Sequence, residues 1–243
     1  MKKNETTGQF IKRKISNIGS VCYRNIAYPF VKIYTERKYN SIISKGSYLR
    51  NGCSLEGSVY IAENCELSNV HLGYGCYIGR NSVASNIFIG KYSCIGSFQT
   101  YIGKHPIHQE NISIHPAFYS AQAQYGYTYV NNNHFNETDY LDEKKGIQIK
   151  IGNDVWSGYG VSFLEGVTVG DGAVIGSGSL VTKDIEPYAI YVGIPAKKIG
   201  TRFDENTIRK LLELKWWDKD SEWIAKNAEQ FSSPDDFIKK HCK

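Results

Sequence analysis

Large apolar residues recur at every sixth position between Ile151 and Glu186. Divided into sixes, this segment has first positions occupied by Ile151, Ser157, Phe163, Val169, Ile175 and Val181. Five of the six are large and apolar, and the fifth position of each block is mostly small or β-branched. A period of six fits neither the 3.6-residue repeat of an α-helix nor the alternation of a simple strand. It is typical of a parallel β-helix built from hexapeptides, in which three short strands close one coil of about eighteen residues.

The same period appears earlier in the chain. Its first positions are Ile43, Leu49, Leu55, Ile61, Leu67, Leu72, Ile78, Ala84, Ile89, Ile95 and Ile102. The steps are mostly six residues, with steps of five after Leu67 and Ala84. Because the shorter step returns once per coil, we expect one corner of the early coils to be tighter by one residue. The pattern predicts a single β-helix that begins near Ile43 and extends along one axis.

Residues 104–148 interrupt this pattern and contain no hexapeptides. They are rich in Tyr, Asn and Gln, and they hold four of the six histidines, His105, His108, His115 and His134. Long segments without regular structure are uncommon unless they are functional or disordered, and the aromatic content argues against disorder. We therefore predict a loop that leaves one corner of the coil, with Ile102 on a third face and Ile151 on the next first face.

The chain then divides into three parts. Residues 1–42 form a basic, largely helical segment, with Ile11, Ile15, Ile18 and Cys22 at helical spacing. Residues 43–200 form the β-helix with its loop, and 201–243 form a helical tail. Asp204 is expected to cap one tail helix, and Ser233 followed by Pro234 marks another helix start. Both terminal segments are expected to cover the open ends of the coil.

The charge of the chain is concentrated at its beginning. Residues 1–38 hold nine Lys or Arg and two Glu, which gives this segment a net charge of +7. Because the whole chain carries +5, the remainder has a net charge of −2. Such an arm is more often a solvated end, while peripheral contact with an anionic membrane surface is the alternative. There is no run of eighteen apolar residues and no apolar signal core near the N-terminus. We expect no nucleic-acid partner and a cytoplasmic protein, with the inner face of the membrane as the alternative location.

The six cysteines show neither a CxxC motif nor metal-ligand spacing, so no metal is expected. Cys53, Cys65 and Cys76 fall at the small fifth position of hexapeptides. We interpret these three residues as small members of the core.

Several motifs together resemble the xenobiotic acetyltransferases. This family includes the type B chloramphenicol acetyltransferases, the streptogramin acetyltransferases and their sugar O-acetyltransferase relatives. The motifs are Ile102–Pro106, Ser113–Ser120, Asp154–Trp156, Gly178–Asp184, Gly193–Lys197, Arg202–Asp204 and Leu212–Asp218. The resemblance covers about residues 43–220. It is specific for the family and weakly specific for the acceptor.

The resemblance implies a left-handed β-helix that works as a homotrimer, with acetyl-CoA in a groove between neighbouring subunits. It implies that His105 is the general base, which takes the proton of an acceptor hydroxyl as the oxygen attacks the thioester. An imidazole with a pKa near 6.5 suits this task at neutral pH. A backbone N–H near Gly158 and Tyr159 would stabilise the developing oxyanion.

The resemblance also implies further contacts. Residues that would line the coenzyme groove are Trp156, Ser177, Thr182, Lys183 and Lys197. The two lysines suit phosphates, although solvated lysines and a packing role for Trp156 are the alternatives. His115, Phe118 and Tyr119 would shape the acceptor pocket, whereas we interpret His108 and His134 as surface groups. Ser157 departs from the family's usual aliphatic residue, and an inward hydroxyl there would need a partner.

Three functional hypotheses follow. The first is an acetyl-CoA-dependent O-acetyltransferase that modifies a sugar hydroxyl, in a surface polysaccharide or its precursor. The second is an antibiotic O-acetyltransferase that acts on chloramphenicol or a streptogramin. The third is a non-catalytic β-helix binding module. The acceptor, and transfer to oxygen rather than nitrogen, remain open at this point.

Overall fold

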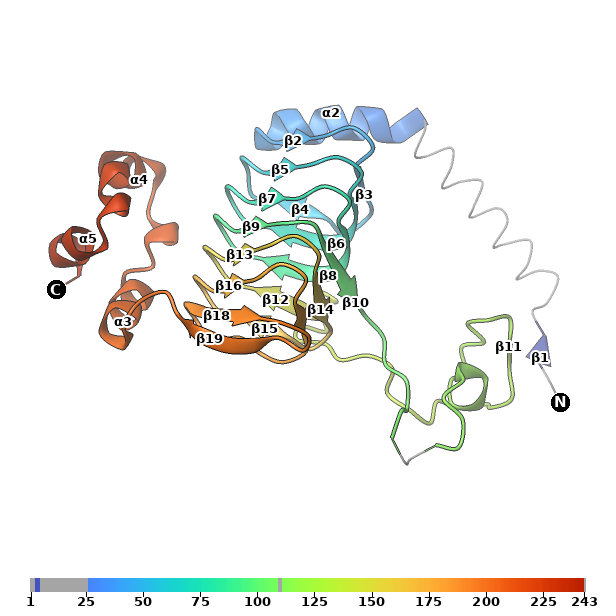
Figure 1. Ribbon diagram of the computed structural model, residues 1–243. Helices are drawn as coiled ribbons and strands as arrows, with labels where there is room; N and C mark the ends of the chain where they lie inside the picture. Colours follow the sequence, from blue (N-terminus) through green and yellow to red (C-terminus); the bar gives the residue numbers. More distant parts are fainter. Residues whose placement is uncertain (1–2, 5–25, 109–110, 243) are drawn as a thin grey trace. The chain divides into compact units, whose positions relative to one another are not determined.

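The computed structural model describes residues 3–4, 26–108 and 111–242. The chain separates into two compact units. One unit comprises residues 39–101 and 140–243 and contains a stack of short parallel strands followed by helices (Figure 1). The other unit comprises residues 1–38 and 102–139. The expected fold class, a mainly β parallel β-helix with helical segments near both ends, is confirmed.

One face of the β-helix is a sheet to which each coil contributes a short strand. Neighbouring strands are parallel until the last pair. The outer residue of each two-residue strand faces solvent, and the inner residue is buried or nearly so. The strands are β2 (Ile42–Ile43), β5 (Tyr60–Ile61), β7 (Tyr77–Ile78), β9 (Cys94–Ile95), β13 (Trp156–Ser157), β16 (Val174–Ile175) and β18 (Ala189–Val192).

The other two faces are joined into one curved sheet. The second face contains β3 (Tyr48–Leu49), the first part of β6 (Glu66–Leu72) and of β8 (Val83–Ile89), β10 (Phe98–Tyr101), β14 (Val161–Leu164) and β17 (Leu180–Val181). The third face contains β4 (Ser54–Leu55), the ends of β6 and β8, β12 (Ile149–Ile151) and β15 (Thr168–Val169).

The two five-residue steps correspond to strands that bend around a corner without a break. In β6 and β8 the bend falls at Asn69 and Asn86, which have φ angles of 51° and 56°. Asparagine tolerates this left-handed conformation better than most residues. Asn69 Nδ2 also donates to Asn86 Oδ1 at 3.1 Å, so equivalent corners of successive coils are bonded to each other. The tighter corner predicted from the repeat is therefore present.

The long segment leaves the coil at this same corner. Strand β10 ends at Tyr101 and β12 begins at Ile149. The predicted coil phase is confirmed for Ile151 but is wrong for Ile102. Ile102 lies outside the strand and is 41% exposed, and Thr100 is the residue in register with Phe163. Ile151 is paired with Ile89 and with Val169, so the coil resumes on the face that carries Ile89, as predicted; this is the face described above as the third.

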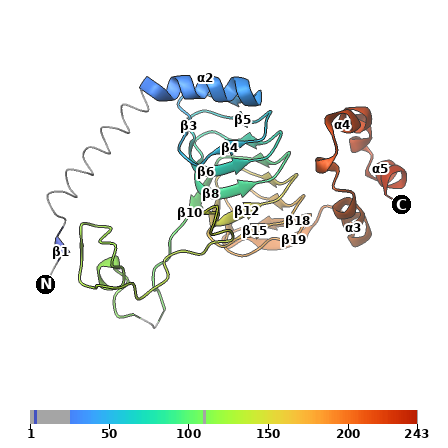
Figure 2. The same cartoon turned by 180° about the vertical axis from the view of Figure 1, so that it is seen from behind.

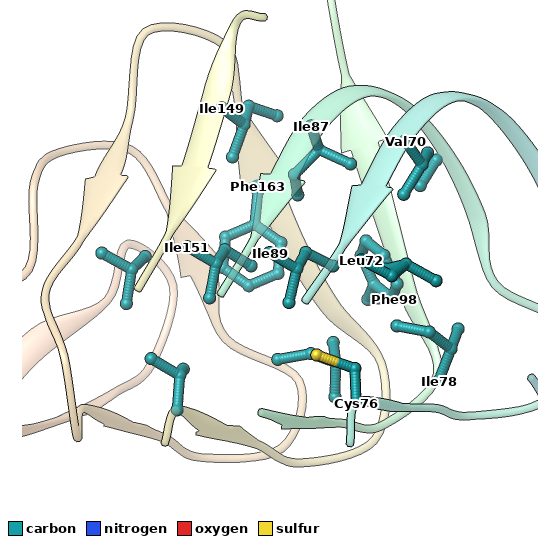
Figure 3. Close-up of a cluster of buried hydrophobic side chains, with 14 of the residues drawn as sticks. Val70, Leu72, Cys76, Ile78, Ile87, Ile89, Phe98, Ile149, Ile151 and Phe163 are labelled. Atoms are coloured by element: carbon teal, nitrogen blue, oxygen red, sulfur yellow. The ribbon is translucent and has the colours of Figure 1, made fainter. Parts of the chain in front are cut away.

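Aliphatic side chains from all three faces fill the interior (Figure 3). Cys65 and Cys76 are each 1% exposed, which confirms them as core residues, and Cys53 packs against the same cluster. The thiols of Cys65 and Cys76 donate to the carbonyls of Gly79 (3.1 Å) and Gly90 (2.9 Å). Burial raises the pKa of the Cys76 thiol to about 12, so it stays protonated and unreactive.

Ser157 points into this apolar interior, as its position in the repeat predicts. It lies in register between Ile95 and Ile175 and is 1% exposed. Its Oγ has no hydrogen-bond partner among the residues that the structure describes. An unpaired buried hydroxyl costs about 1–3 kcal/mol relative to a paired one.

The β-helix ends in an antiparallel pair, β18 with β19 (Lys197–Thr201). The tail helices follow as α3 (Glu205–Leu214), α4 (Ser221–Asn227) and α5 (Pro234–His241), with 3₁₀ turns at Trp216–Asp218 and Ala228–Ser232. Asp204 caps α3 by accepting a hydrogen bond from the Thr207 N–H at 2.9 Å, which confirms the predicted cap. Helix α5 begins at Pro234, as predicted.

The tail helices lie beside the β-helix (Figures 1 and 2), and residues of the tail contact a corner of the coil at more than one level. Lys91, in the fourth coil, pairs with Asp218 at 2.8 Å, and the ring of Tyr92 lies 5.1 Å from that of Trp216. Arg202, just after β19, pairs with Asp154 of the next coil at 2.9 Å. The tail therefore covers a side of the β-helix, whereas the sequence predicts that it covers the last coil.

The second unit contains fewer regular elements. Helix α2 (Tyr28–Tyr39) precedes the first coil, and β11 (Tyr127–Thr128) pairs antiparallel with β1 (Lys3–Asn4). The predicted helix around Ile11–Cys22 lies outside the described residues. No helix in the described part of the chain is long and apolar enough to cross a membrane.

Candidate functional site

His105 is held at one ring nitrogen by two oxygens. Its Nδ1 lies 3.2 Å from the carbonyl oxygen of Ile114 and 2.7 Å from the hydroxyl of Tyr119. The residue is exposed, and its Nε2 has no hydrogen-bond partner among the described residues. The loop thus fixes the ring through one nitrogen and leaves the other available.

Tyr119 is buried beside His105 and does not line an open surface. It is 0% exposed, and its ring packs edge-on against Phe135 at 5.6 Å. Burial raises the pKa of its phenol, so the hydroxyl is neutral at physiological pH. Its position therefore differs from that expected of an acceptor-pocket residue.

Glu137 ties the two ends of the loop together close to His105. Its carboxylate accepts hydrogen bonds from Ser120 Oγ (2.8 Å) and from Gln124 Nε2 (2.9 and 3.1 Å). Its backbone carbonyl accepts from the N–H of Lys104, the residue before His105, at 2.8 Å. The Lys104 side chain pairs with Asp139. These contacts give His105 a defined backbone position.

His115 has a structural role in the same loop. Its Nδ1 accepts a hydrogen bond from the Ala117 N–H at 3.1 Å and so caps the 3₁₀ turn Pro116–Phe118. An acceptor at Nδ1 requires the neutral tautomer with its proton on Nε2. The ring also stacks on Tyr127 at 5.9 Å. His115 is therefore a loop-shaping residue with a donor at Nε2.

Next to His115 is a cluster of aromatic rings with open faces. Phe118 stacks on Tyr129 at 5.1 Å, and the two side chains are 52% and 50% exposed. Tyr125 lies 5.8 Å from His115 and is 65% exposed. Such faces can pack against the apolar side of a sugar ring or against a flat drug molecule.

Trp156 lies on the outer surface of the first face of the β-helix. It is in register with Cys94 on one side and Val174 on the other, and it is 48% exposed. On the same face, Tyr77 is in register with Cys94 from the other side, and its ring stacks on that of Tyr60 in the next coil at 5.5 Å. The first face thus presents a row of exposed apolar and aromatic side chains.

The backbone around Gly158 is already hydrogen-bonded. The Gly158 N–H donates to the Ile175 carbonyl at 2.8 Å, and the Tyr159 N–H donates to Ser177 Oγ at 3.2 Å. A Cβ on Gly158 would lie 2.3 Å from Ser177 Oγ, so glycine is required there for packing. Both N–H groups predicted to contact the oxyanion are therefore hydrogen-bonded, Gly158 within the strand ladder and Tyr159 to the hydroxyl of the exposed Ser177.

The predicted phosphate contacts are available. Lys183 and Lys197 are exposed and have no ion-pair partner among the described residues, whereas the neighbouring Lys198 pairs with Glu186 at 3.7 Å. Ser177 is exposed and Thr182 is partly buried. Within the described ranges, no group of three or more His, Cys, Asp or Glu side chains is placed to hold a metal ion.

The predicted site residues fall into two sets. The loop unit contains the four residues predicted for the base and the acceptor pocket, and the β-helix unit contains the seven predicted to meet the coenzyme. The contributions of Ile114 and Glu137 are not predicted from the sequence. Ile114 acts through its backbone, which leaves no signal in its side chain. The only hint of Glu137 is that it is the first carboxylate after a stretch without Asp, Glu, Lys or Arg, residues 118–136.

Comparison with known proteins agrees with the repeat. Residues 148–183 match the family model described as bacterial transferase hexapeptide (six repeats). A chloramphenicol acetyltransferase of Agrobacterium fabrum is 40% identical over 143 residues, which are 58% of this chain and 64% of that protein. A probable macrolide acetyltransferase of Lysinibacillus sphaericus is 45% identical over 83 residues, 34% of this chain and 46% of that protein. The chain thus spans less than two thirds of these relatives.

A solved structure has the same fold. AntD, an N-acyltransferase from Bacillus cereus in complex with dTDP and 3-hydroxybutyryl-CoA, superposes with a TM-score of 0.56 at 21% identity. The superposition covers 78% of this chain and 89% of that one. The curated proteins described above, to which this chain is similar, are named acetyltransferases. The repeat and the coil identify the chain as a hexapeptide-repeat β-helix protein.

Proposed function

We propose that this chain is an acetyl-CoA-dependent O-acetyltransferase that acts on a sugar hydroxyl, in a surface polysaccharide or its precursor. The observation that carries the proposal is the environment of His105. Its Nδ1 is engaged by two oxygens while its Nε2 has no partner among the described residues. This is the arrangement a general base requires. Relatives at about 40% identity that are named acetyltransferases support the same reaction.

The reaction needs one base and no covalent enzyme intermediate. His105 Nε2 takes the proton of the acceptor hydroxyl as the oxygen attacks the thioester carbonyl carbon. The attack forms a tetrahedral intermediate with a negatively charged oxygen. The intermediate then collapses, the carbon–sulfur bond breaks, and the coenzyme A thiolate leaves and takes the proton from the imidazolium. The products are the acetyl ester and free coenzyme A, and His105 returns to its neutral form.

The residues of the β-helix unit fit coenzyme A. Lys183 and Lys197 are exposed cations without an ion-pair partner among the described residues, and each can meet a phosphate. Trp156 offers a half-exposed apolar face to the adenine or pantetheine part. The coenzyme supplies the activated acetyl group, and the chain supplies binding and the base.

A homotrimer with the coenzyme between subunits is part of the proposal. The exposed row on the first face, which includes Tyr60, Tyr77 and Trp156, supports self-association through this side of the β-helix. Light scattering tests it: a monomer at micromolar concentration would contradict an intersubunit site.

The acceptor could also be an antibiotic. The names of the relatives favour chloramphenicol or a macrolide, and the exposed rings of Phe118 and Tyr129 could pack against such a molecule. We favour a sugar because residues 131–133 are three consecutive, exposed asparagines, which can hydrogen-bond a glycan.

Coenzyme A release from acetyl-CoA, followed with a thiol reagent, separates these alternatives. The panel contains nucleotide sugars, oligosaccharides with free hydroxyls, amino sugars, chloramphenicol and a streptogramin A. We expect release with a hydroxyl-bearing sugar and an ester product by mass spectrometry. Release only with a drug would support the antibiotic function, and an amide product would mean N-transfer. A non-catalytic module would neither release nor bind coenzyme A.

A further inference from the structure

We infer that Tyr119, together with the Ile114 carbonyl, holds His105 as the tautomer protonated at Nδ1, so that Nε2 presents its lone pair to the acceptor hydroxyl. Tyr119 is thus a positioning residue for the base. The inference rests on the proposed function for its catalytic meaning, although the tautomer itself can be measured without any activity.

The Ile114 carbonyl favours a proton on Nδ1 of His105. A carbonyl oxygen can only accept a hydrogen bond. Its position 3.2 Å from His105 Nδ1 is favourable only when Nδ1 carries the proton. The Tyr119 hydroxyl oxygen, 2.7 Å from the same nitrogen, then also accepts a hydrogen bond from this N–H. The two oxygens together hold one N–H between them.

The opposite arrangement is less favourable. If the Tyr119 hydroxyl donated to an unprotonated Nδ1, the imidazole proton would move to Nε2. The lone pairs of Nδ1 and of the Ile114 oxygen would then face each other across 3.2 Å. Nε2 would also become a donor and could not take a proton from the acceptor.

The orienting group differs from the carboxylate that often supports a catalytic histidine. No Asp or Glu side chain in the described part of the chain bonds to His105. Tyr119 is fully buried and its pKa is raised, so it contributes a neutral oxygen. During the reaction Nε2 gains the acceptor proton, Nδ1 keeps its own, and the tyrosine keeps its hydroxyl proton.

His115 provides an internal reference. Its Nδ1 accepts from the Ala117 N–H, which requires the tautomer with the proton on Nε2. The structure therefore predicts opposite tautomers for two histidines ten positions apart in one loop. The ¹⁵N shifts of the two ring nitrogens distinguish these forms directly.

The test is ¹⁵N magic-angle-spinning NMR of the full chain with labelled histidine, at pH 8. Loss of signals in His105→Asn and His115→Asn assigns the two residues among six histidines. We expect a protonated Nδ1 in His105 and a protonated Nε2 in His115. A protonated Nε2 in wild-type His105 would overturn the inference, and this result needs no variant of Tyr119.

Tyr119→Phe tests the contribution of the hydroxyl while keeping the ring. We expect a mixture of His105 tautomers, and a fall in kcat of about tenfold to a hundredfold, below the 10²–10⁴ that the base itself contributes. The KM for acetyl-CoA should not change. Phe135→Leu loosens the packing around the Tyr119 ring but keeps its hydroxyl, and it should keep the wild-type tautomer.

Tyr188→Phe is the matched control, because it also removes a buried hydroxyl, one that has no partner among the described residues. It should leave both the tautomer and kcat unchanged. A Tyr119→Phe variant with a wild-type tautomer and kcat would overturn the role of Tyr119. If wild-type His105 shows the expected tautomer but no acceptor gives transfer, the proposed function fails and the inference about the ring stands.

Discussion

Asn86 and Gln148 bond to each other at the corner where the coil resumes after the long loop. Asn86 Nδ2 donates to Gln148 Oε1 at 2.6 Å, and the Gln148 N–H donates to the Asn86 carbonyl at 2.8 Å. The two residues are 62 positions apart in sequence. Gln148 thus takes the place that a corner asparagine would occupy in an uninterrupted coil, which lets the β-helix continue past the insertion.

Replacing Asn86 should separate the two contributions of this corner. Asn86→Gly removes the hydrogen bonds to Asn69 and Gln148 but accepts the φ of 56°, so we expect a loss of about 1–3 kcal/mol in the free energy of unfolding. Asn86→Ala should cost about 1 kcal/mol more, because a Cβ disfavours the left-handed conformation. Denaturant unfolding measures both, and equal losses for the two variants would contradict this account.

Ser157 and Ser179 make a matched pair of buried hydroxyls, each 1% exposed. Ser179 Oγ donates to the Gly176 carbonyl (2.7 Å) and accepts from the Gly193 N–H (3.1 Å), whereas Ser157 Oγ has no partner within the described residues. We expect Ser179→Ala to destabilise by about 1–3 kcal/mol and Ser157→Ala to stabilise by about 1 kcal/mol. A clear loss of stability in Ser157→Ala would mean that its hydroxyl is satisfied.

The Asp154–Arg202 pair should make stability depend on pH. Burial raises the pKa of Asp154 above its ordinary 3.8, although Arg202 lowers it. The folded state therefore holds this proton more tightly than the unfolded state, and stability falls as pH rises from about 3.8 through the raised value. Arg202→Met should raise the pKa further and steepen that fall.

Denaturant unfolding between pH 4 and pH 8, with ¹³C NMR of the Asp154 carboxyl, measures the change. Arg209→Met is the control, because Arg209 pairs with Glu213 on an exposed face of α3 at 3.3 Å. It should leave the pH dependence parallel to that of the wild type. If the Arg202→Met curve were also parallel, the two charges would not be coupled.

Lysine substitutions test the coenzyme groove. Lys183→Met and Lys197→Met each remove an exposed cation that has no ion-pair partner in the described part of the chain. We expect the Kd for coenzyme A to rise about three- to tenfold, which corresponds to the loss of one solvated charge contact. Lys198→Met removes a cation that is already paired with Glu186 and should change the Kd less. Calorimetry at two salt concentrations measures this, and three equal effects would contradict the assignment.

The sequence predicts the coil well because every hexapeptide must meet the same physical requirement. Each inward position must be apolar or small, and residues such as Ile61, Cys65 and Ile175 obey it. The tighter corner was also visible, since Asn69 and Asn86 shorten the repeat at the same place. The position after Ile95 is not predicted, because the residue in register with Phe163 is the polar Thr100, whereas the apolar Ile102 lies beyond the strand.

The site is harder to predict because its side chains act in ways that spacing does not record. His105 and the capping residue His115 both occur next to proline in a polar loop, and only their Nδ1 partners distinguish them. Tyr119 reads as a pocket residue in sequence, yet it is buried against His105. The sequence does not reveal that the Gly158 N–H donates to the Ile175 carbonyl in the strand ladder.

The central claim is that His105 is the base for acetyl transfer. The most direct measurement is the rate of coenzyme A release by wild type and His105→Asn, with the best acceptor of the panel and with coenzyme A binding measured by calorimetry on the same samples. We expect a fall in kcat of about 10²–10⁴ with an unchanged Kd for coenzyme A. Wild-type turnover by His105→Asn, with coenzyme A bound normally, would contradict the mechanism.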